Sequence, residues 1–325
     1  TPTSYEGIII ASNYIEANVT GIFIGEIVSP HVVNNTVEAS IGIECAQTDQ
    51  MNIQYNTISV KTKGFTSSYC KGEILKNEIN GACNSDDCSK VAFTKVAALG
   101  AEFDEYSDLE FNYNNLTLFD IHVRVVNSEL EIENNVLDYG NVGILFEETD
   151  NISIRYNLIY NNSISINLIN SFDIEIEMNN LSNFEKGIHS INSSSNILTN
   201  YYDQGLVCLD FLDSEYQVNN YDNFGCTTAY ILESYNVRIN IVTDEGVPSP
   251  NHQFYYYNDF DTTKIYSSTY ETGFSDYIEL RTTKVDNSGL NIDFNNYHFG
   301  YYHNDILNLI EQNIDTNRTI TAYLD

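Results

Sequence analysis

An asparagine recurs at nearly constant spacing through the first two thirds of this chain. An aliphatic residue or Tyr follows it two positions later, and most intervals are close to 21 residues, with one longer interval between Asn77 and Asn114. A unit of this length cannot close a hydrophobic core alone, so successive units must stack on one another. The recurring residues are Asn13, Asn35, Asn56, Asn77, Asn114, Asn134, Asn157, Asn179, Asn200 and Asn219.

Each unit also carries the pattern of short β-strands. Alternating apolar residues precede the asparagine, as at Ile152/Ile154 and Ile174/Ile176. Such alternation places apolar side chains on one face of a strand. The units lack the i, i+3, i+4 apolar spacing of helix pairs, which disfavours a helical repeat. About three short strands fit in each unit.

Two residue types are expected at the corners between these strands. Asn tolerates the left-handed backbone conformation, and its side-chain amide can bond to the Asn of the next unit to form a ladder. A Gly followed by an apolar residue comes about eight positions after the Asn in several units, and we expect it to supply a corner with positive φ. These glycines are Gly21, Gly42, Gly64, Gly143 and Gly187.

The units resemble the right-handed parallel β-helix repeats of pectate-lyase-like and NosD-like surface proteins. The likeness covers roughly residues 1–235 and is carried by residues 34–37, 151–159 and 185–188. It implies an all-β fold with a β-helix of about ten turns. Repeats of this family serve lyases, hydrolases, tail spikes, adhesins and surface-layer components, so the resemblance implies a fold and leaves the function open.

A different pattern begins near Val237. Alternating segments at 237–242, 255–257, 277–280 and 318–324 are separated by turns such as Asp244-Glu-Gly. This predicts a small β-sandwich over residues 236–325. Its order of strands and turns resembles a carboxypeptidase-regulatory-like domain, which implies a spacer or docking unit.

Six cysteines are expected to form three disulfides. Cys208 and Cys226 share a phase on adjacent turns, and turns about 4.8 Å apart suit a disulfide. Cys45 and Cys70, separated by 25 residues, can also lie one turn apart, and Cys83 is expected to pair with Cys88 in a loop inserted at about 80–105. That loop is either a binding loop or an inert excursion. A zinc site needs a second ligand pair nearby, which is missing, so disulfides and an oxidising exterior are favoured.

Other features agree with a secreted or cell-surface glycoprotein. No apolar run is long enough for a membrane-spanning helix, and a chain that starts at Thr1 suits a processed form or a fragment boundary. Eight Asn-x-Ser/Thr sequons are candidate glycosylation sites. They are Asn18, Asn34, Asn115, Asn151, Asn161, Asn180, Asn192 and Asn317.

The chain is strongly acidic, with a formal net charge of −32. Nucleic-acid binding is disfavoured because Lys and Arg must neutralise phosphates. The acidity serves solubility, adaptation to salt, or bridging of subunits by Ca²⁺, which takes oxygen ligands. No EF-hand spacing occurs, so a Ca²⁺ site would be irregular. No other cofactor is expected.

No catalytic motif is evident in the sequence. The Asp86-Asp87 pair lies in the cysteine loop, and the histidines at 31, 122, 189, 252, 298 and 303 show no ligand or triad spacing. We therefore expect a non-enzymatic protein. Tyrosines 255–257 and 301–302 form a candidate patch for glycans or a neighbouring subunit, or they belong to ordinary half-buried strands.

The leading hypothesis is a structural subunit of an extracellular filament, sheath or surface layer. A β-helix end exposes unpaired backbone groups that can template another copy of the chain, and residues 1–10 could add a strand to a neighbour. The alternatives are a carbohydrate-binding adhesin and a polysaccharide lyase or hydrolase.

Overall fold

The computed structural model describes residues 7–81, 97–104, 106–219, 224–243, 245–259, 263–272, 274–285, 291–294, 296–303, 306–314 and 318–324. The chain forms two compact units. The first comprises Thr1–Cys208 and Ser214–Thr227, and the second comprises Leu209–Asp213 and Thr228–Asp325. Over the described ranges, no helix is long and apolar enough to cross a membrane.

The regular structure is entirely β. The strands are β1 (Ile9–Ala11), β2 (Tyr14–Glu16), β3 (Thr20–Gly25), β4 (His31–Val33), β5 (Thr36–Ala46), β6 (Met51–Gln54), β7 (Thr57–Ser68), β8 (Lys71–Leu75), β9 (Glu78–Gly81), β10 (Ala97–Asp104), β11 (Asp108–Asn112), β12 (Asn115–Val126), β13 (Glu129–Glu133), β14 (Val136–Glu147), β15 (Ser153–Arg155), β16 (Leu158–Ile169), β17 (Ile174–Glu177), β18 (Asn180–Ile191), β19 (Ser194–Leu198), β20 (Tyr201–Leu212), β21 (Glu215–Asn219), β22 (Phe224–Thr243), β23 (Gln253–Asn258), β24 (Ile265–Ser268), β25 (Phe274–Val285), β26 (Asn291–Asp293), β27 (Asn296–His303), β28 (Ile306–Asn313) and β29 (Arg318–Leu324).

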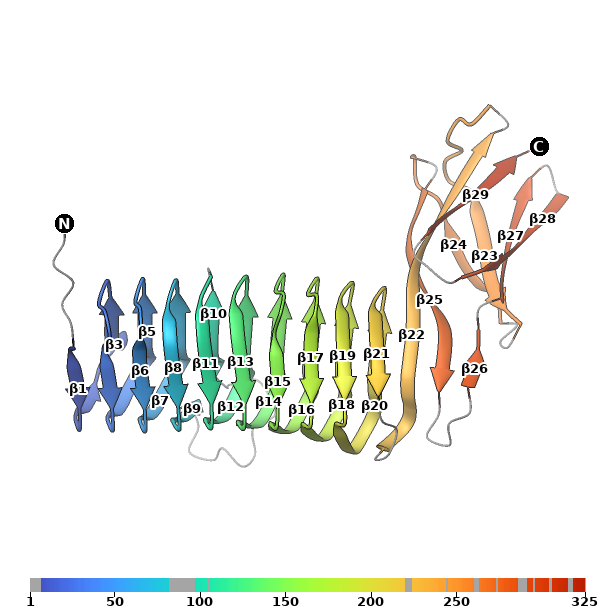
Figure 1. Cartoon of the computed structure of the whole chain (residues 1–325). Coiled ribbons are helices and arrows are strands. Elements are labelled where there is room, and N and C mark those ends of the chain that lie inside the picture. Colours follow the sequence, from blue (N-terminus) through green and yellow to red (C-terminus); the bar gives the residue numbers. More distant parts are fainter. Residues whose placement is uncertain are drawn as a thin grey trace. The chain divides into compact units, whose positions relative to one another are not determined.

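The first unit is a parallel β-solenoid of about nine turns, so the expected β-helix is confirmed with one turn fewer than expected (Figure 1). One sheet, here called the short-strand sheet, runs in the order β1-β4-β6-β8-β11-β13-β15-β17-β19-β21. The other, here called the long-strand sheet, stacks strands such as β5, β7, β12, β14, β16 and β18. Apolar columns of both sheets face inward; Ile132 and Ile154 pair in register and are fully buried.

A ladder of asparagines runs along one corner, as the repeat predicts. Asn56 Nδ2 donates to Asn77 Oδ1 over 2.9 Å, and Asn77 Nδ2 donates to Asn114 Oδ1 over 3.0 Å. Asn135, and not the expected Asn134, is the ladder residue of its turn, since its Oδ1 accepts from Asn114. The left-handed residue is the one before each ladder Asn, such as Asn134 at φ 56°. One asparagine was expected to turn the corner and to form the ladder. Two neighbouring residues share these roles: the first has the left-handed backbone and the second forms the ladder hydrogen bonds.

The repeated glycines serve close packing instead of turning the chain. None of Gly21, Gly42, Gly64, Gly143 and Gly187 has positive φ. A Cβ on Gly64 would lie 2.3 Å from the Gly100 oxygen of the next turn, and one on Gly143 would lie 2.4 Å from the Ser165 oxygen. Any larger residue would push adjacent turns apart, which corrects the expectation of a glycine corner.

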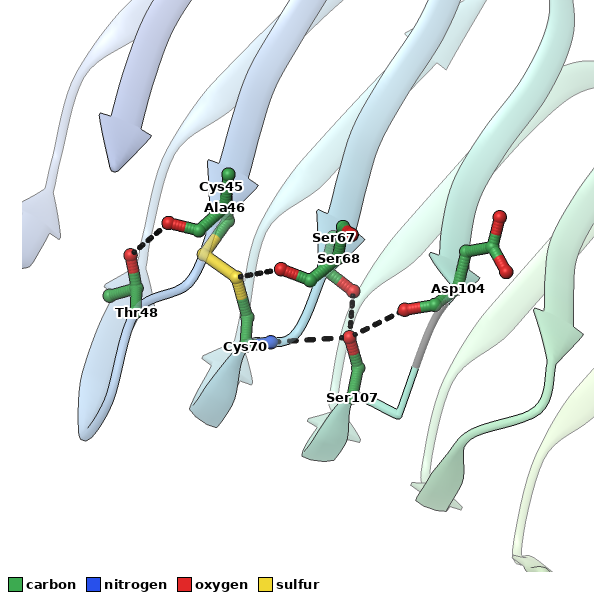
Figure 2. Close-up of a disulfide and its surroundings, with 8 residues drawn as sticks. All are labelled: Cys45, Ala46, Thr48, Ser67, Ser68, Cys70, Asp104 and Ser107. Carbon is green, nitrogen blue, oxygen red and sulfur yellow. Dashed lines mark hydrogen bonds between the residues drawn. A yellow bond between two sulfur atoms is a disulfide. The ribbon is translucent and has the colours of Figure 1, made fainter. Parts of the chain in front are cut away.

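Small hydroxyl residues and a disulfide occupy the corner that follows the long strands. The Ser171 amide donates to Ser193 Oγ at 3.0 Å. Cys70 takes the equivalent place in its turn, where its amide donates to Ser107 Oγ at 3.4 Å, and it is bonded to Cys45 (Figure 2). Cys208–Cys226 is the second disulfide. The expected Cys83–Cys88 pair lies outside the described residues, between β9 and β10.

The second unit contains two sheets that share one core. Strands β22, β25 and β26 pair antiparallel and β29 adds parallel to β22, while β24, β23, β27 and β28 form an antiparallel sheet. Residues from both sheets meet in a buried cluster that includes Ile239, Leu280, Phe299 and Ile320. This arrangement is compatible with the expected sandwich. A carboxypeptidase-regulatory-like identity stays a prediction, as do the domain limits 1–235 and 236–325.

Candidate functional site

A column of acidic side chains lies on the outer face of the short-strand sheet. Glu110 pairs in register with Glu73 on one side and with Glu131 on the other. The neighbours Leu109 and Phe111 point into the core, so the glutamates point outward. Strands in a sheet are about 4.8 Å apart, which places three carboxylates on successive turns.

The outer column continues beyond the glutamates with mostly polar residues. After Glu131 it passes through Ser153, Glu175, Asn196 and Gln217, each paired in register with the next. These strands appear side by side as β13, β15, β17, β19 and β21 in Figure 1. The face is therefore a straight row of carboxylate, amide and hydroxyl groups along the solenoid.

A shallow groove of about 440 Å³ covers the three glutamates. Its lining contains one cation, Lys71, which forms an ion pair with Asp108 at 3.3 Å. A second groove, of about 540 Å³, lies further along the same face over β17, β19 and β21. The carboxylates of the first groove are Asp49, Glu73, Asp108, Glu110, Glu129 and Glu131.

The surroundings of Glu110 raise the pKa of its carboxyl group. Desolvation raises its pKa, and the negative charges of Glu73, Glu131 and Glu133 raise it further. In the described part of the chain, no Lys or Arg forms an ion pair with Glu73, Glu110 or Glu131. A carboxyl group with a raised pKa is one element that acid–base chemistry uses.

Exposed tyrosines flank this face at both of its corners. Tyr69 and Tyr106 lie at the corner before the short strands, with ring centroids 6.1 Å apart, and Tyr106 lines a third groove with Lys71 and Glu129. Tyr55 and Tyr113 lie at the corner after them. All four have positive φ and are between 48% and 72% exposed. The same conformation recurs at these corners in other turns, as at Asn127 and Asn134, so it belongs to the solenoid fold.

Further along the face, Arg155 offsets part of the negative charge. Its guanidinium lies 2.5 Å from Glu175, 3.4 Å from Glu177 and 3.9 Å from Glu133. The hydrogen bond with Glu175 raises the pKa of Arg155, so it stays charged. The uncompensated charge is concentrated at Glu73, Glu110 and Glu131.

The expected tyrosine patch of the second unit is not assembled as a surface. Tyr256 packs against the core, and Tyr301 is 6% exposed, with its hydroxyl donating to the Tyr323 carbonyl. Tyr255 is 3% exposed beneath the Lys264 ammonium, 4.1 Å from the ring centre. The side chain of Tyr302 lies outside the described residues. On the solenoid, the exposed Tyr69 and Tyr106 lie side by side.

The candidate glycosylation sites differ in accessibility. Asn18, Asn34, Asn115, Asn151, Asn180 and Asn192 are exposed. Asn161 is half-buried, since its amide donates to Asp138 at 2.7 Å and its carbonyl accepts from Asn183 at 2.7 Å. Asn317 lies outside the described residues. Glycosylation of these sequons stays a prediction.

No metal centre is formed by the residues that the structure describes. They contain no group of three or more His, Cys, Asp or Glu side chains able to hold an ion. His298 is held by Asp259 at 2.6 Å and stacks on Tyr257, while His122 is buried in the solenoid. Bridging of subunits by Ca²⁺, one of the roles considered for the acidity, stays a prediction.

The carboxylate column was missed at the sequence level, although a signal for it exists. Glu73, Glu110 and Glu131 each lie four residues before a ladder asparagine, namely Asn77, Asn114 and Asn135. When Asn134 is taken as the repeat residue of this turn, Glu131 lies three residues before it instead of four. A one-residue shift moves a side chain to the other face of a strand, so the column disappears.

Comparison with known proteins gives likeness in fold. No family model and no curated protein matches the chain. Similar solved structures include tailspike protein 2 of an Escherichia coli O157:H7 bacteriophage, with 10% identity, a TM-score of 0.43, and coverage of 95% of this chain and 59% of that one. A tailspike of E. coli bacteriophage HK620, solved with a pentasaccharide, has 8% identity, a TM-score of 0.40, and coverage of 91% and 71%. The chain thus spans about three fifths of the first tailspike.

The expectation of a non-enzymatic protein is contradicted. A third similar structure, with 9% identity, a TM-score of 0.37 and coverage of 93% and 66%, is named as the enzymatically active domain of a bacteriophage CBA120 tailspike. That expectation also rested on the lack of clustered carboxylates, and the folded chain brings Glu73, Glu110 and Glu131 together. Separation in sequence had concealed them.

Proposed function

We propose that this chain is a carbohydrate-binding protein of an external surface and that the outer face of the short-strand sheet binds the glycan. The observation that carries the proposal is the groove over Glu73, Glu110 and Glu131, flanked by the exposed Tyr69 and Tyr106. Carboxylates accept hydrogen bonds from sugar hydroxyls, and tyrosine rings cover the apolar faces of sugars. An external location is supported by the Cys45–Cys70 and Cys208–Cys226 disulfides.

A glycan array with the full chain tests this function. We expect binding to a restricted set of oligosaccharides, weakened at least about tenfold by a Tyr69→Ala/Tyr106→Ala double substitution, a loss of about 1.4 kcal/mol or more. The matched control is Tyr277→Ala, which removes a tyrosine that is 66% exposed in the second unit. Absence of binding to every glycan would overturn the proposal.

Glycan hydrolysis is a second candidate, favoured by one observation. Glu110 has a raised pKa, and Glu73 and Glu131 flank it on adjacent turns. Glycosidases pair a protonated carboxyl with an ionised one about 5 to 9.5 Å away. Release of reducing ends from a bound oligosaccharide, lost in Glu110→Gln with binding retained, would establish it. Binding without release would leave carbohydrate binding alone.

Assembly with further copies of the chain fits a surface protein and remains a proposal. Ile9, Val19 and Phe23 in the first described turn are each more than 60% exposed. Such side chains beside open strand edges favour contact with another β-structure. Size-exclusion chromatography with electron microscopy tests this, and a monomer at high concentration would contradict a filament.

A further inference from the structure

A row of exposed tyrosines runs along the corner where the short strands end. Tyr55, Tyr113 and Tyr156 directly follow the short strands β6, β11 and β15, and they are 51%, 57% and 50% exposed. We infer that this row binds a linear β-1,4-linked glycan laid along the solenoid axis, with one tyrosine ring against every second sugar. The inference rests on the proposed function, because the row borders the short-strand face.

The asparagine ladder shows that the tyrosines of the row lie two turns apart. Each of them directly precedes a ladder residue. The ladder connects consecutive turns through Asn56, Asn77, Asn114, Asn135 and Asn157. Lys76 and Asn134 therefore occupy the same corner in the two turns between the tyrosines. Adjacent turns are about 4.8 Å apart, so neighbouring tyrosines of the row are roughly 9.6 Å apart.

This spacing matches one class of polysaccharide. In an extended β-1,4-linked glycan, alternate sugars are turned over, so the same face recurs once per disaccharide, and a disaccharide is close in length to two turns. Tyr55, Tyr113 and Tyr156 share a left-handed backbone, with φ between 55° and 58°, and the same place in the turn. Their Cα–Cβ bonds therefore leave the corner in nearly the same direction. Three such rings can cover the apolar faces of the first, third and fifth sugars.

The residue type at this corner also points to a ligand. The left-handed conformation belongs to the corner in successive turns, and asparagine tolerates it best, as at Asn34 and Asn134. The fold alone therefore does not require a bulky aromatic side chain there. The amide of Asn134 and the ammonium of Lys76, between the tyrosines, can bond to sugar hydroxyls. Lys76 also donates to the Tyr55 hydroxyl at 3.1 Å, and Tyr55 is 51% exposed beside it.

The test measures how affinity depends on the length of the glycan. Titration calorimetry would use cello-oligosaccharides and N-acetylated chito-oligosaccharides of two to six sugars, both uncharged, because a chain with a net charge of −32 repels anionic glycans. The full chain is produced without N-linked glycans, since the sequon Asn115 lies beside Tyr113. We expect the affinity of at least one series to rise up to five sugars, the length that reaches all three tyrosines, and to change little at six. The α-1,4-linked malto-oligosaccharides, which coil, should bind at least about tenfold more weakly.

Variants locate the binding on the row. Tyr113→Ala should weaken the five-sugar oligomer at least about tenfold, and Tyr113→Phe should keep most of the affinity, because stacking needs the ring and not the hydroxyl. Tyr156→Ala should move the plateau from five sugars to three, since Tyr55 and Tyr113 span only three. The matched control is Tyr139→Ala on the long strand β14, which removes a tyrosine that is 56% exposed and has the same left-handed backbone. It should leave every affinity unchanged.

The outcomes separate this inference from the proposed function. Equal affinity for the α-1,4-linked series would overturn the linear class of glycan, and a plateau at another length would overturn the two-turn spacing. Affinity that is unchanged in Tyr113→Ala would overturn the location. Failure of both β-1,4-linked series to bind, when the glycan array shows other ligands, would overturn the inference and leave the proposed function standing.

Discussion

Glu110 lies directly beside Glu73 in the short-strand sheet, although the insertion after β9 separates them in the sequence. The repeat restores its phase after this insertion, because the Asn77 amide still donates to Asn114 Oδ1 at 2.9 Å. Like charges on adjacent strands repel one another. The chain therefore maintains an unfavourable contact on a face where solubility alone would allow a neutral residue.

Removing one of these charges should stabilise the protein. Glu110 has a pKa raised by desolvation and by Glu73, Glu131 and Glu133. A carboxyl whose folded pKa is raised contributes stability at low pH, which is lost as the pH rises through that pKa. Glu110→Gln should therefore raise the free energy of unfolding at neutral pH by a few tenths of a kcal/mol, a small gain because the site is exposed, and Tm should rise with it. Thermal unfolding followed by circular dichroism measures this. The part of the gain that comes from Glu73, Glu131 and Glu133 should shrink in about 1 M salt, and the absence of any gain at neutral pH would contradict the account.

The asparagine ladder should contribute far more to the stability of the fold than the corner residue beside it. Asn77 is 2% exposed, and its Oδ1 accepts from both the amide and the side chain of Asn56. Asn77→Ala should cost about 2 to 4 kcal/mol of unfolding free energy, because buried donors lose their partner. Asn134→Ala, at a half-buried left-handed corner, should cost about 1 kcal/mol. Equal losses in urea unfolding would contradict the division of roles between ladder and corner.

Buried His122 should make the solenoid sensitive to acid. Its Nε2 lies 2.9 Å from the Asp138 carbonyl, and desolvation lowers its pKa from 6.5 to about 4. The folded state thus binds fewer protons than the unfolded state between these values, so stability falls as the pH drops from 6.5 to 4. The lost contribution is roughly 3 kcal/mol. His122→Leu should flatten the dependence of the unfolding free energy on pH between 4 and 6.5. The control His31→Gln, at an exposed histidine, should leave this dependence as it is in the parent protein. An unchanged slope in His122→Leu would contradict the role of His122.

The Cys45–Cys70 disulfide should stabilise the early turns. It closes 25 residues of chain, for which loop entropy gives about 3 kcal/mol. A Cys45→Ala/Cys70→Ala double variant should lose about this amount in chemical unfolding. Non-reducing peptide mapping should find this bond and Cys208–Cys226, and it also tests the predicted Cys83–Cys88 pair. Free thiols at Cys45 and Cys70 would contradict both the pairing and an oxidising location.

The solenoid could be predicted from the sequence because the asparagines of its ladder recur at a nearly constant interval. Asn56 and Asn77 recur at the interval that their hydrogen bond requires. The Cys208–Cys226 disulfide was predicted from a shared phase and the Cys45–Cys70 disulfide from its separation of 25 residues. The site could not be predicted in this way, because it depends on which side chains align across turns. That alignment depends on the one-residue difference between Asn134 and Asn135, and local sequence pattern does not resolve it.

The most direct test of carbohydrate binding on the short-strand face is carbodiimide labelling of carboxylates with and without a bound glycan from the array. The account predicts that the glycan protects Glu73, Glu110 and Glu131, while Glu185 on β18 is labelled equally in both states. Full labelling of the three glutamates in the presence of saturating glycan would contradict the account.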